Sequence, residues 1–264
     1  MTDTPSGPVS GADPDRVVEV LPRYLAGRGT CDLATVWPFP ADQGWTVHAP
    51  HLGQRIATSS CQRVRCGNNE GRPWVVEARR DPFAAPAWGV TFAWDTPTEL
   101  LAAFHAQLLR SYGSADRPLE SFLVDHAHPV QAYLPLLITG WKHEISTSGW
   151  QTFTSPDGLA TVRHRYAPET DEKADAWTVF VGERGLSLWS ATFTAATPVH
   201  LLAAFTTSVV AKAPLIRNLS QVPTDTRPMR RLPVHLSDRP PAAQPQVPGL
   251  PAAPGTGTAP GPRR

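Results

Sequence analysis

Two pairs of arginines have the residue type and spacing that most directly suggest chemistry. Arg63 and Arg65 are separated by one residue, as are Arg163 and Arg165. In an extended strand, this spacing places both guanidinium groups of a pair on one face of a sheet. Basic and aromatic side chains on a twisted sheet are the means by which single-strand nucleic-acid binders hold their ligand. The alternative is a solvated outer face, where the arginines lie opposite Asp or Glu on neighbouring strands.

The cysteines and histidines suggest less. Cys61 and Cys66 are five positions apart, whereas a zinc site uses a Cys-x2-4-Cys spacing together with a matching second pair. We therefore predict ordinary half-buried thiols and no metal site. His126 and His128 follow Asp125 and would share one face of an extended segment. That pattern fits a fragment of a metal or acid–base site, but we favour surface histidines in a linker.

Motifs that would indicate an enzyme do not occur in the sequence. There is no Gly-x-Ser-x-Gly, no phosphate-binding Gly-x4-Gly-Lys-Ser/Thr, no Gly-x-Gly-x-x-Gly and no His-Glu-x-x-His. We therefore predict no catalytic residues and no cofactor.

The segments that would position the arginines occur twice. Residues 88–104 read WGVTFAWDTPTELLAAF, and residues 189–205 read WSATFTAATPVHLLAAF. The two segments align with each other without a gap. Alternating apolar residues before each Thr-Pro predict a half-buried strand. Thr96 and Thr197 are then placed to cap the helix that follows, with the proline as its first residue. Glu99 would complete a capping box in the first copy.

Large apolar side chains recur at matching positions and are predicted to form the core beneath each helix. They are Trp74, Trp88, Phe92, Leu101 and Phe104 in the first copy, and Trp177, Trp189, Phe193, Leu202 and Phe205 in the second.

Looser matches extend the repeat upstream. Residues 63–66 are matched with residues 163–166, Trp45 with Trp150, and a short lead-in at residues 21–27 (LPRYLAG) with residues 134–140 (LPLLITG). Each unit is predicted to hold three to four antiparallel strands followed by one helix. A unit this small is marginal alone, so we predict an α+β fold of two tandem repeats packed with pseudo-two-fold symmetry.

Charge and composition divide the 264-residue chain into segments. Residues 212–264 carry eight Lys and Arg against two Asp, while residues 1–211 carry 16 Lys and Arg against 21 Asp and Glu. We predict a disordered N-terminus (1–14), a first repeat with its lead-in (15–115), a linker (116–128), a second repeat (129–215) and a basic, Pro-rich disordered tail (216–264). No apolar run reaches the roughly 20 residues of a membrane-spanning helix. The odd cysteine count, which includes Cys31, favours the cytoplasm.

Four of these segments carry a family resemblance. Residues 21–27, 79–104, 155–158 (SPDG) and 189–205 resemble the actinobacterial, Streptomyces-type "domain of unknown function 317" family, over roughly residues 15–212. The resemblance implies two tandem copies, and it supplies no activity or catalytic residues. The first copy departs from the pattern, because SSCQ at residues 59–62 stands where the second copy has SPDG.

From these observations we expect a non-enzymatic binding or adaptor protein with an unknown protein partner. The alternative is a single-stranded nucleic-acid binder that uses Arg63, Arg65, Arg163, Arg165 and the basic tail. We rank it second because the acidic balance of the repeats would repel a phosphate backbone. An enzyme of unknown type is the second alternative.

Overall fold

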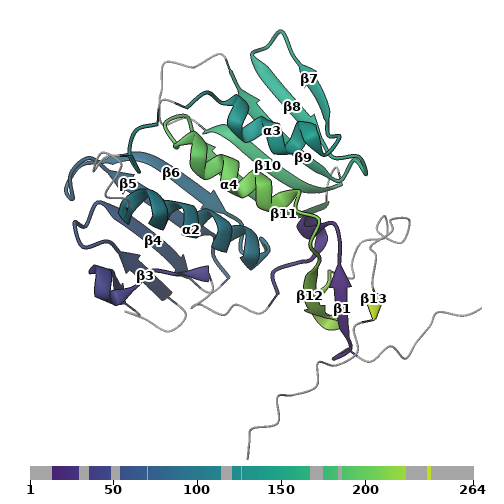
Figure 1. Ribbon diagram of the computed structural model, residues 1–264, viewed down its shortest axis with the longest axis horizontal. Helices are drawn as coiled ribbons and strands as arrows, with labels where there is room; N and C mark the ends of the chain where they lie inside the picture. Colours follow the sequence, from purple (N-terminus) through teal and green to yellow (C-terminus); the bar gives the residue numbers. More distant parts are fainter. Residues whose placement is uncertain are drawn as a thin grey trace, which may run out of the picture.

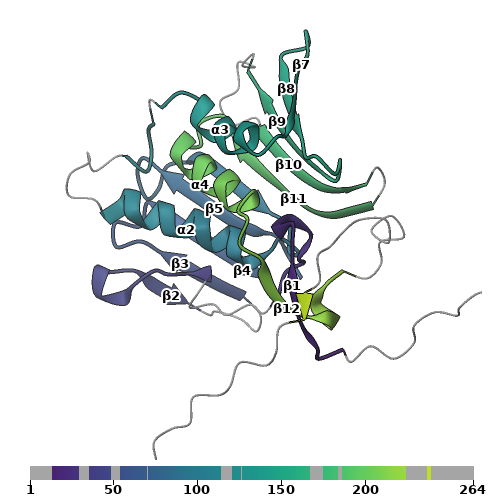
Figure 2. The same ribbon diagram turned by 45° about the vertical axis from the view of Figure 1, so that its right-hand side comes forward.

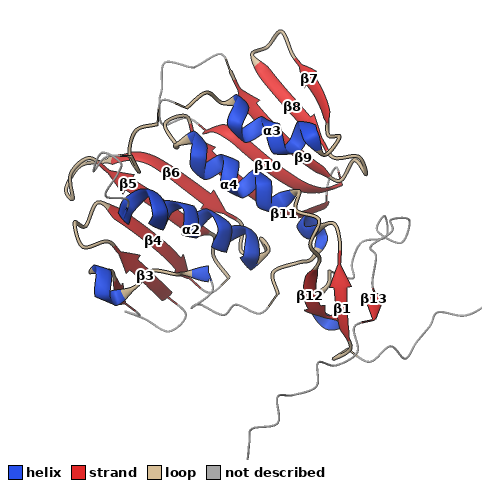
Figure 3. Cartoon of the chain, in the orientation of Figure 1, coloured by secondary structure: helices blue, strands red, loops and turns tan. Residues whose placement is uncertain are grey.

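The computed structural model describes residues 14–29, 36–48, 54–69, 71–113, 121–125, 127–166, 175–183, 186–223 and 237–238. These residues form a ten-stranded antiparallel sheet, three α-helices that lie on one face of it, and a separate three-stranded sheet (Figures 1 and 3). The fold is therefore α+β, as the repeats predict. Cys31, His126, residues 1–13 and most of the expected tail lie outside the described residues.

Each repeat contributes five consecutive strands to the large sheet. The first repeat forms β2 (Thr46–His48), β3 (Gln54–Thr58), β4 (Val64–Asn69), β5 (Trp74–Arg79), β6 (Pro86–Phe92) and then α2 (Thr98–Gly113). The second forms α3 (Val130–Ile138), β7 (Lys142–Ile145), β8 (Trp150–Thr154), β9 (Ala160–Arg165), β10 (Asp175–Glu183), β11 (Leu186–Thr194) and α4 (Val199–Val209).

The expectation of three to four strands per unit omitted the edge strands. Every residue of β2 and of β7 is exposed. Such strands lack the alternation of buried and exposed residues that identifies a strand in a sequence.

The two repeats meet in the middle of one continuous sheet. The strand order is β2-β3-β4-β5-β6-β11-β10-β9-β8-β7, and Figure 2 shows β2 and β7 at opposite ends. At the junction, Thr91 pairs with Thr192, Val90 with Phe193 and Phe92 with Ala191.

The core lies between the sheet and the helices and runs across this junction. All ten side chains predicted for the core are buried, and none is more than 3% exposed. The Phe92 ring lies 5.3 Å from that of Phe104 in its own repeat, and 5.6 and 5.4 Å from those of Phe193 and Phe205 in the other. Because these rings interdigitate, the two repeats share one core.

The helices begin where the Thr-Pro pairs predict, but the threonines do not cap them. α2 and α4 start two residues after Thr96 and Thr197. The N-cap of α4 is Pro198, which has no side chain to accept a hydrogen bond, and the buried Thr96 hydroxyl has no partner among the described residues. Pro97 and Pro198 were expected to be the first helical residues, but each lies immediately before the helix. The threonine hydroxyls therefore stand too far from the free amides of the first turn.

Strands from both ends of the described chain form the smaller sheet. β1 (Val17–Val20) lies between β12 (Leu215–Asn218) and β13 (Ser237–Asp238), beside the large sheet (Figure 1). Regular secondary structure therefore continues past residue 216, where we expected the tail to begin. It includes β12 and the short η3 (Leu219–Gln221). We call β1, β12 and η3 the terminal clasp.

An ion pair between the buried Arg217 and the half-buried Glu99 joins the clasp to the first repeat. Arg217 is 3% exposed, and its guanidinium donates to both carboxylate oxygens of Glu99 at 2.6 Å. It also donates to the carbonyls of Ala26 at 3.1 Å and Gly27 at 3.2 Å. Glu99 at the start of α2 thus binds Arg217 instead of completing a capping box. A buried charge requires this degree of pairing to be tolerated.

The two lead-in segments that match in sequence adopt different structures. Residues 21–27 form a turn around η1 (Arg23–Leu25), whereas residues 134–140 form the second half of α3 and the turn after it. The first segment packs against the second repeat, where the Trp189 indole donates to the Tyr24 carbonyl at 2.8 Å. In the first repeat the linker fills this role, since the Trp88 indole donates to the Phe122 carbonyl, also at 2.8 Å.

Among the described helices, none combines the length and the apolar character required to cross a membrane.

Candidate functional site

The face of the large sheet opposite the helices carries no described helix, and we call it the open face (Figures 1 and 2). Strand register identifies its residues, because directly paired residues point to the same side. One row crosses all ten strands. It consists of His48, Ile56, Gly67, Val75, Thr91, Thr192, Thr178, Arg163, Thr152 and Glu144.

Hydroxyl groups dominate the open face. Nine threonines point to it from the strands of both repeats: Thr46, Thr58, Thr91, Thr152, Thr154, Thr161, Thr178, Thr192 and Thr194. A threonine hydroxyl both donates and accepts hydrogen bonds. Such a surface suits a ligand that presents alternating donors and acceptors, as a polypeptide does.

Arginines contribute the charge of the open face. Arg65 and Arg163 are exposed. The guanidinium carbons of Arg163 and Arg165 lie 4.4 and 5.6 Å from the centre of the Trp150 ring, which belongs to the neighbouring strand β8. These are cation–π contacts, so the ring and the two arginines form one cluster.

Opposite charges also lie on the open face. Arg79 and Glu77 form an ion pair at 2.8 Å, and Lys142 and Glu144 form one at 2.6 Å. Asp175 is the third carboxylate, opposite Thr194. The described strand positions of this face therefore hold five basic side chains (Arg65, Arg79, Lys142, Arg163, Arg165) against three acidic ones. The net charge of the open face is therefore positive, whereas the net charge of residues 1–211 as a whole is negative.

The matching of the two arginine pairs between repeats was wrong. Cys66 pairs with Val76, two residues after Trp74, and Val162 pairs with Val179, two residues after Trp177. The register thus aligns Cys66 with Val162, and Arg163 with Gly67. The loops of the two copies differ in length, and an alignment by residue letters shifted the strand by four positions.

Arg63 does not share the open face with the other three arginines. It precedes β4, donates to the Arg79 carbonyl at 3.2 Å, and its guanidinium carbon lies 5.3 Å from the centre of the buried Phe122 ring. The matching of Trp45 with Trp150 was also wrong. Trp45 immediately precedes β2 and Trp141 immediately precedes β7.

A Ser–His–Asp arrangement that sequence reasoning missed lies between the two helices of the repeats. Ser111 in α2 and His200 in α4 approach to 2.7 Å between Oγ and Nε2, and His200 Nδ1 lies 2.7 Å from Oδ2 of Asp125. These distances match those of a hydrolase triad. The three residues come from separate segments, so no local motif could reveal them.

The surroundings of this arrangement favour a structural role. Ser111 is 4% exposed and also lies 3.0 Å from the Gln107 carbonyl one turn earlier. Asp125 accepts from the His200 backbone amide at 3.0 Å, so it caps α4. Burial raises the pKa of Asp125, but hydrogen bonds from the amides of His200 and Ala127 and from the His200 ring outweigh burial, and the net pKa is lowered. The group therefore ties the linker to both helices.

The cysteines and the linker histidine occupy unremarkable positions. Cys66 is buried on the helix side, and burial raises the pKa of its thiol. Cys61 is exposed in the β3–β4 turn and accepts from the Tyr112 hydroxyl at 3.3 Å. His128 Nδ1 accepts from the Val130 amide at 3.2 Å, at the start of α3. Within the described residues, no three His, Cys, Asp or Glu side chains form a group that could hold a metal ion.

The fold and the open face define an α+β protein with two five-strand units and one sheet surface that no described helix covers. The chain matches the family model of SPDY, a domain of unknown function (DUF317), over residues 58–114 and 154–215. The first region begins at the last residue of β3 and the second at the last residue of β8, and each includes the helix of its repeat. The two matches are consistent with two copies of the domain. No curated protein and no solved structure matches the chain.

Proposed function

We propose that this protein is a non-enzymatic binding or adaptor protein whose open face binds the acidic surface of a protein partner. The ten-stranded open face is the observation that carries the proposal. Ten strands at about 4.8 Å spacing span about 43 Å, a width that suits a protein surface or an extended polypeptide. An antiparallel sheet commonly packs one face on the core and leaves the other to solvent. Because the helix side forms the core here, the open face is the sheet surface that a partner could reach.

The chemistry of the open face favours an acidic protein over single-stranded nucleic acid. Nucleic-acid binders of this type stack successive bases on exposed aromatic rings. In the described strands of the open face, Trp150 and Phe180 are the large aromatic side chains, and Arg163 and Arg165 already contact Trp150. Threonine hydroxyls and arginines, by contrast, suit carboxylates and backbone carbonyls.

We further propose that a pseudo-two-fold axis relates the two repeats and passes between Thr91 and Thr192. The register supports this, because these residues hold equivalent positions in the two copies and pair with each other. Phe92 pairs with Ala191, the equivalent of Val90, and Val90 pairs with Phe193, the equivalent of Phe92. A partner would then meet similar strand surfaces on both sides of the axis. A cytoplasmic location and an actinobacterial origin remain predictions from composition and resemblance.

Replacing the open-face arginines tests this function. Arg65→Ala with Arg163→Ala removes two charges from the open face. Arg55→Ala with Arg110→Ala removes two exposed charges elsewhere, because Arg55 pairs with Asn68 on the helix side and Arg110 lies on α2. Binding of a poly-glutamate peptide and of an oligo-dT strand would be measured by fluorescence anisotropy at several salt concentrations. The full chain is used, so any contribution of residues 212–264 cancels between the two variants.

We expect the open-face variant to bind poly-glutamate about three- to tenfold more weakly, and the control to change less than twofold. Equal binding by both variants would contradict the proposal. If oligo-dT binds instead, and the open-face variant flattens its slope of log affinity against log salt by about 0.7 per lost phosphate contact, the nucleic-acid alternative replaces it.

A further inference from the structure

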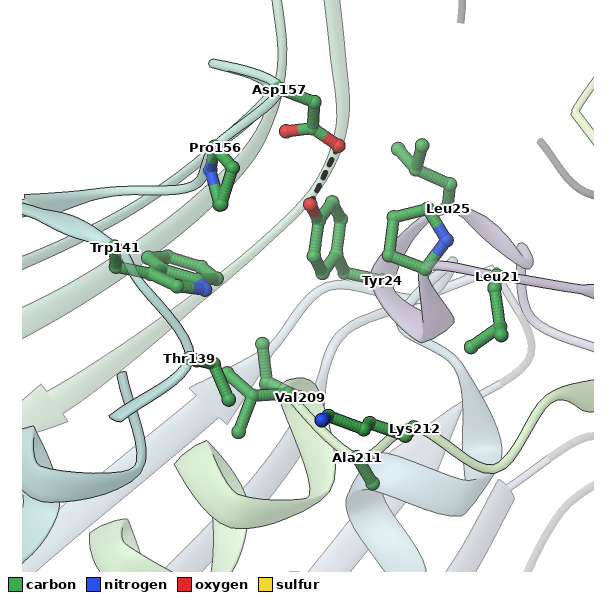
Figure 4. A pocket seen from close by; sticks show the side chains of 12 residues that line it. Leu21, Tyr24, Leu25, Thr139, Trp141, Pro156, Asp157, Val209, Ala211 and Lys212 are labelled. Atoms are coloured by element: carbon green, nitrogen blue, oxygen red, sulfur yellow. Dashed lines mark hydrogen bonds between the residues drawn. The ribbon is translucent and has the colours of Figure 1, made fainter. Parts of the chain in front are cut away.

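A cavity of about 490 Å³ lies at the end of the second repeat (Figure 4), and none of its lining residues belongs to the open face. It is bounded by η1, by the turn after α3, by the β8–β9 turn and by the end of α4. Leu25, Trp141, Pro156 and Val209 form apolar walls, and Lys212 stands at the rim.

The cavity exists because α4 is shorter than α2. The gap-free alignment of the repeats matches Tyr112, in the last turn of α2, with Ala213, which lies beyond the end of α4. The Tyr112 ring lies 5.2 Å from that of Trp45, so α2 closes the corresponding space in the first repeat with its own final turn. In the second repeat, Tyr24 from η1 contacts Trp141 at 6.0 Å instead. The space between η1 and the end of α4 is left open.

The acidic group of the cavity is already satisfied. Asp157 accepts from the Tyr24 hydroxyl at 2.6 Å, the Ser155 hydroxyl at 2.5 Å and the Leu159 amide at 3.0 Å. Burial and the neighbouring Asp157 raise the pKa of Tyr24, so its hydroxyl remains a donor to that carboxylate. Lys212, by contrast, is exposed and lines the opening. A ligand therefore meets apolar walls and one ammonium group.

We propose that this cavity binds a small monocarboxylic acid with an apolar body. The body would pack against Trp141, Leu25 and Val209, and the carboxylate would pair with the Lys212 ammonium. Burial of an aliphatic chain supplies the affinity, because removing apolar surface from water is favourable. The ion pair at the rim supplies the preference for an acid over a neutral analogue. This inference is independent of the function proposed for the open face.

Titration of the full chain with octanoate and with octan-1-ol tests the inference by calorimetry. Lys212→Gln removes the charge and keeps a polar side chain that is one heavy atom shorter. Ala211→Trp places a large ring into the cavity lining, and Ala213→Trp is its matched control, because Ala213 is exposed next to the cavity without lining it. Circular dichroism and thermal melts establish that each variant is folded.

We expect octanoate to bind more tightly than octan-1-ol. Lys212→Gln should weaken octanoate about two- to fivefold, as an exposed ion pair does, and leave octan-1-ol unchanged. Ala211→Trp should abolish binding of both probes, and Ala213→Trp should not. Absence of octanoate binding to the wild type, equal weakening of both probes by Lys212→Gln, or binding that survives Ala211→Trp would each overturn the proposal. If Ala211→Trp does not fold, nuclear Overhauser contacts between octanoate and the Trp141 ring in the wild-type protein decide the question.

Discussion

At the residue scale, His105 links the stability of the core to pH. The ring is buried in α2, and Nδ1 lies 2.7 Å from the Val36 carbonyl, to which it must donate. Nε2 has no partner among the described residues. Burial lowers the pKa of His105 to about 4, against the backbone hydrogen bond that raises it. His164 in β9, whose Nδ1 contacts the Tyr133 hydroxyl, has its pKa lowered by burial to about 4 as well.

These histidines should make the protein less stable in mild acid. The unfolded chain takes up a proton at each ring near the ordinary pKa of 6.5, whereas the folded chain does so only near 4. The free energy of unfolding therefore keeps its full value above pH 6.5 and decreases as the pH falls from 6.5 to 4, because the unfolded chain binds protons there and the folded chain does not. For His105 alone, linkage gives a loss of about 2 kcal/mol in the free energy of unfolding by pH 5.

Urea unfolding of His105→Asn at pH 7 and pH 5 measures this contribution. The asparagine amide can replace the Nδ1–H donor without titrating. We expect its loss of stability between the two pH values to be smaller than that of the wild type by about 2 kcal/mol. His128→Asn, at the exposed start of α3, is the control and should follow the wild type. If His105→Asn and the wild type lose the same stability, the ring is not held neutral by the fold.

At the scale of elements, the terminal clasp joins the ends of the described chain to α2. Arg217 is its central contact, with two hydrogen bonds to Glu99 and three to backbone carbonyls. Arg217→Ala leaves the Glu99 carboxylate, whose side chain is 33% exposed, without its partner. It also removes the donor to the carbonyls of Ala26, Ile216 and Gly27. We expect a loss of about 3 kcal/mol in the free energy of unfolding, measured by urea denaturation.

Arg23→Ala is the control. It removes an exposed hydrogen bond to the Ala213 carbonyl and should lower the free energy of unfolding by less than about 1 kcal/mol. A similar small cost for both would show that the clasp adds little to the fold.

Some of these elements could be predicted from sequence patterns, and others could not. The strand and helix around each Thr-Pro follow from alternation and helical spacing, because one face of each is fully buried. The edge strands β2 and β7 bury neither face, so they leave no pattern. Cys66 and Val162 hold equivalent places without sharing a residue type, and only strand register relates them. The Ser111–His200–Asp125 group arises from the packing of α2 against α4, which no local sequence encodes.

At the scale of the whole molecule, duplication produces a surface that one unit lacks. Each repeat provides five strands, and the pairing of β6 with β11 joins them into one sheet. The helices cover one side of that sheet, and no described helix covers the other side (Figure 3). Thr91 and Thr192 pair at the centre of this open face, so the partner that we propose would contact them wherever it spans both repeats.

A single substitution at that centre tests the role of the open face most directly. Thr192→Glu places a carboxylate in the middle of the open face, and Thr207→Glu places one on the exposed side of α4. The affinity for poly-glutamate would be compared by fluorescence anisotropy, with thermal melts to establish folding. Because like charges in an interface repel, we predict that Thr192→Glu weakens binding at least about tenfold while Thr207→Glu binds as the wild type does. Wild-type affinity in a folded Thr192→Glu variant would contradict the assignment of the open face as the binding surface.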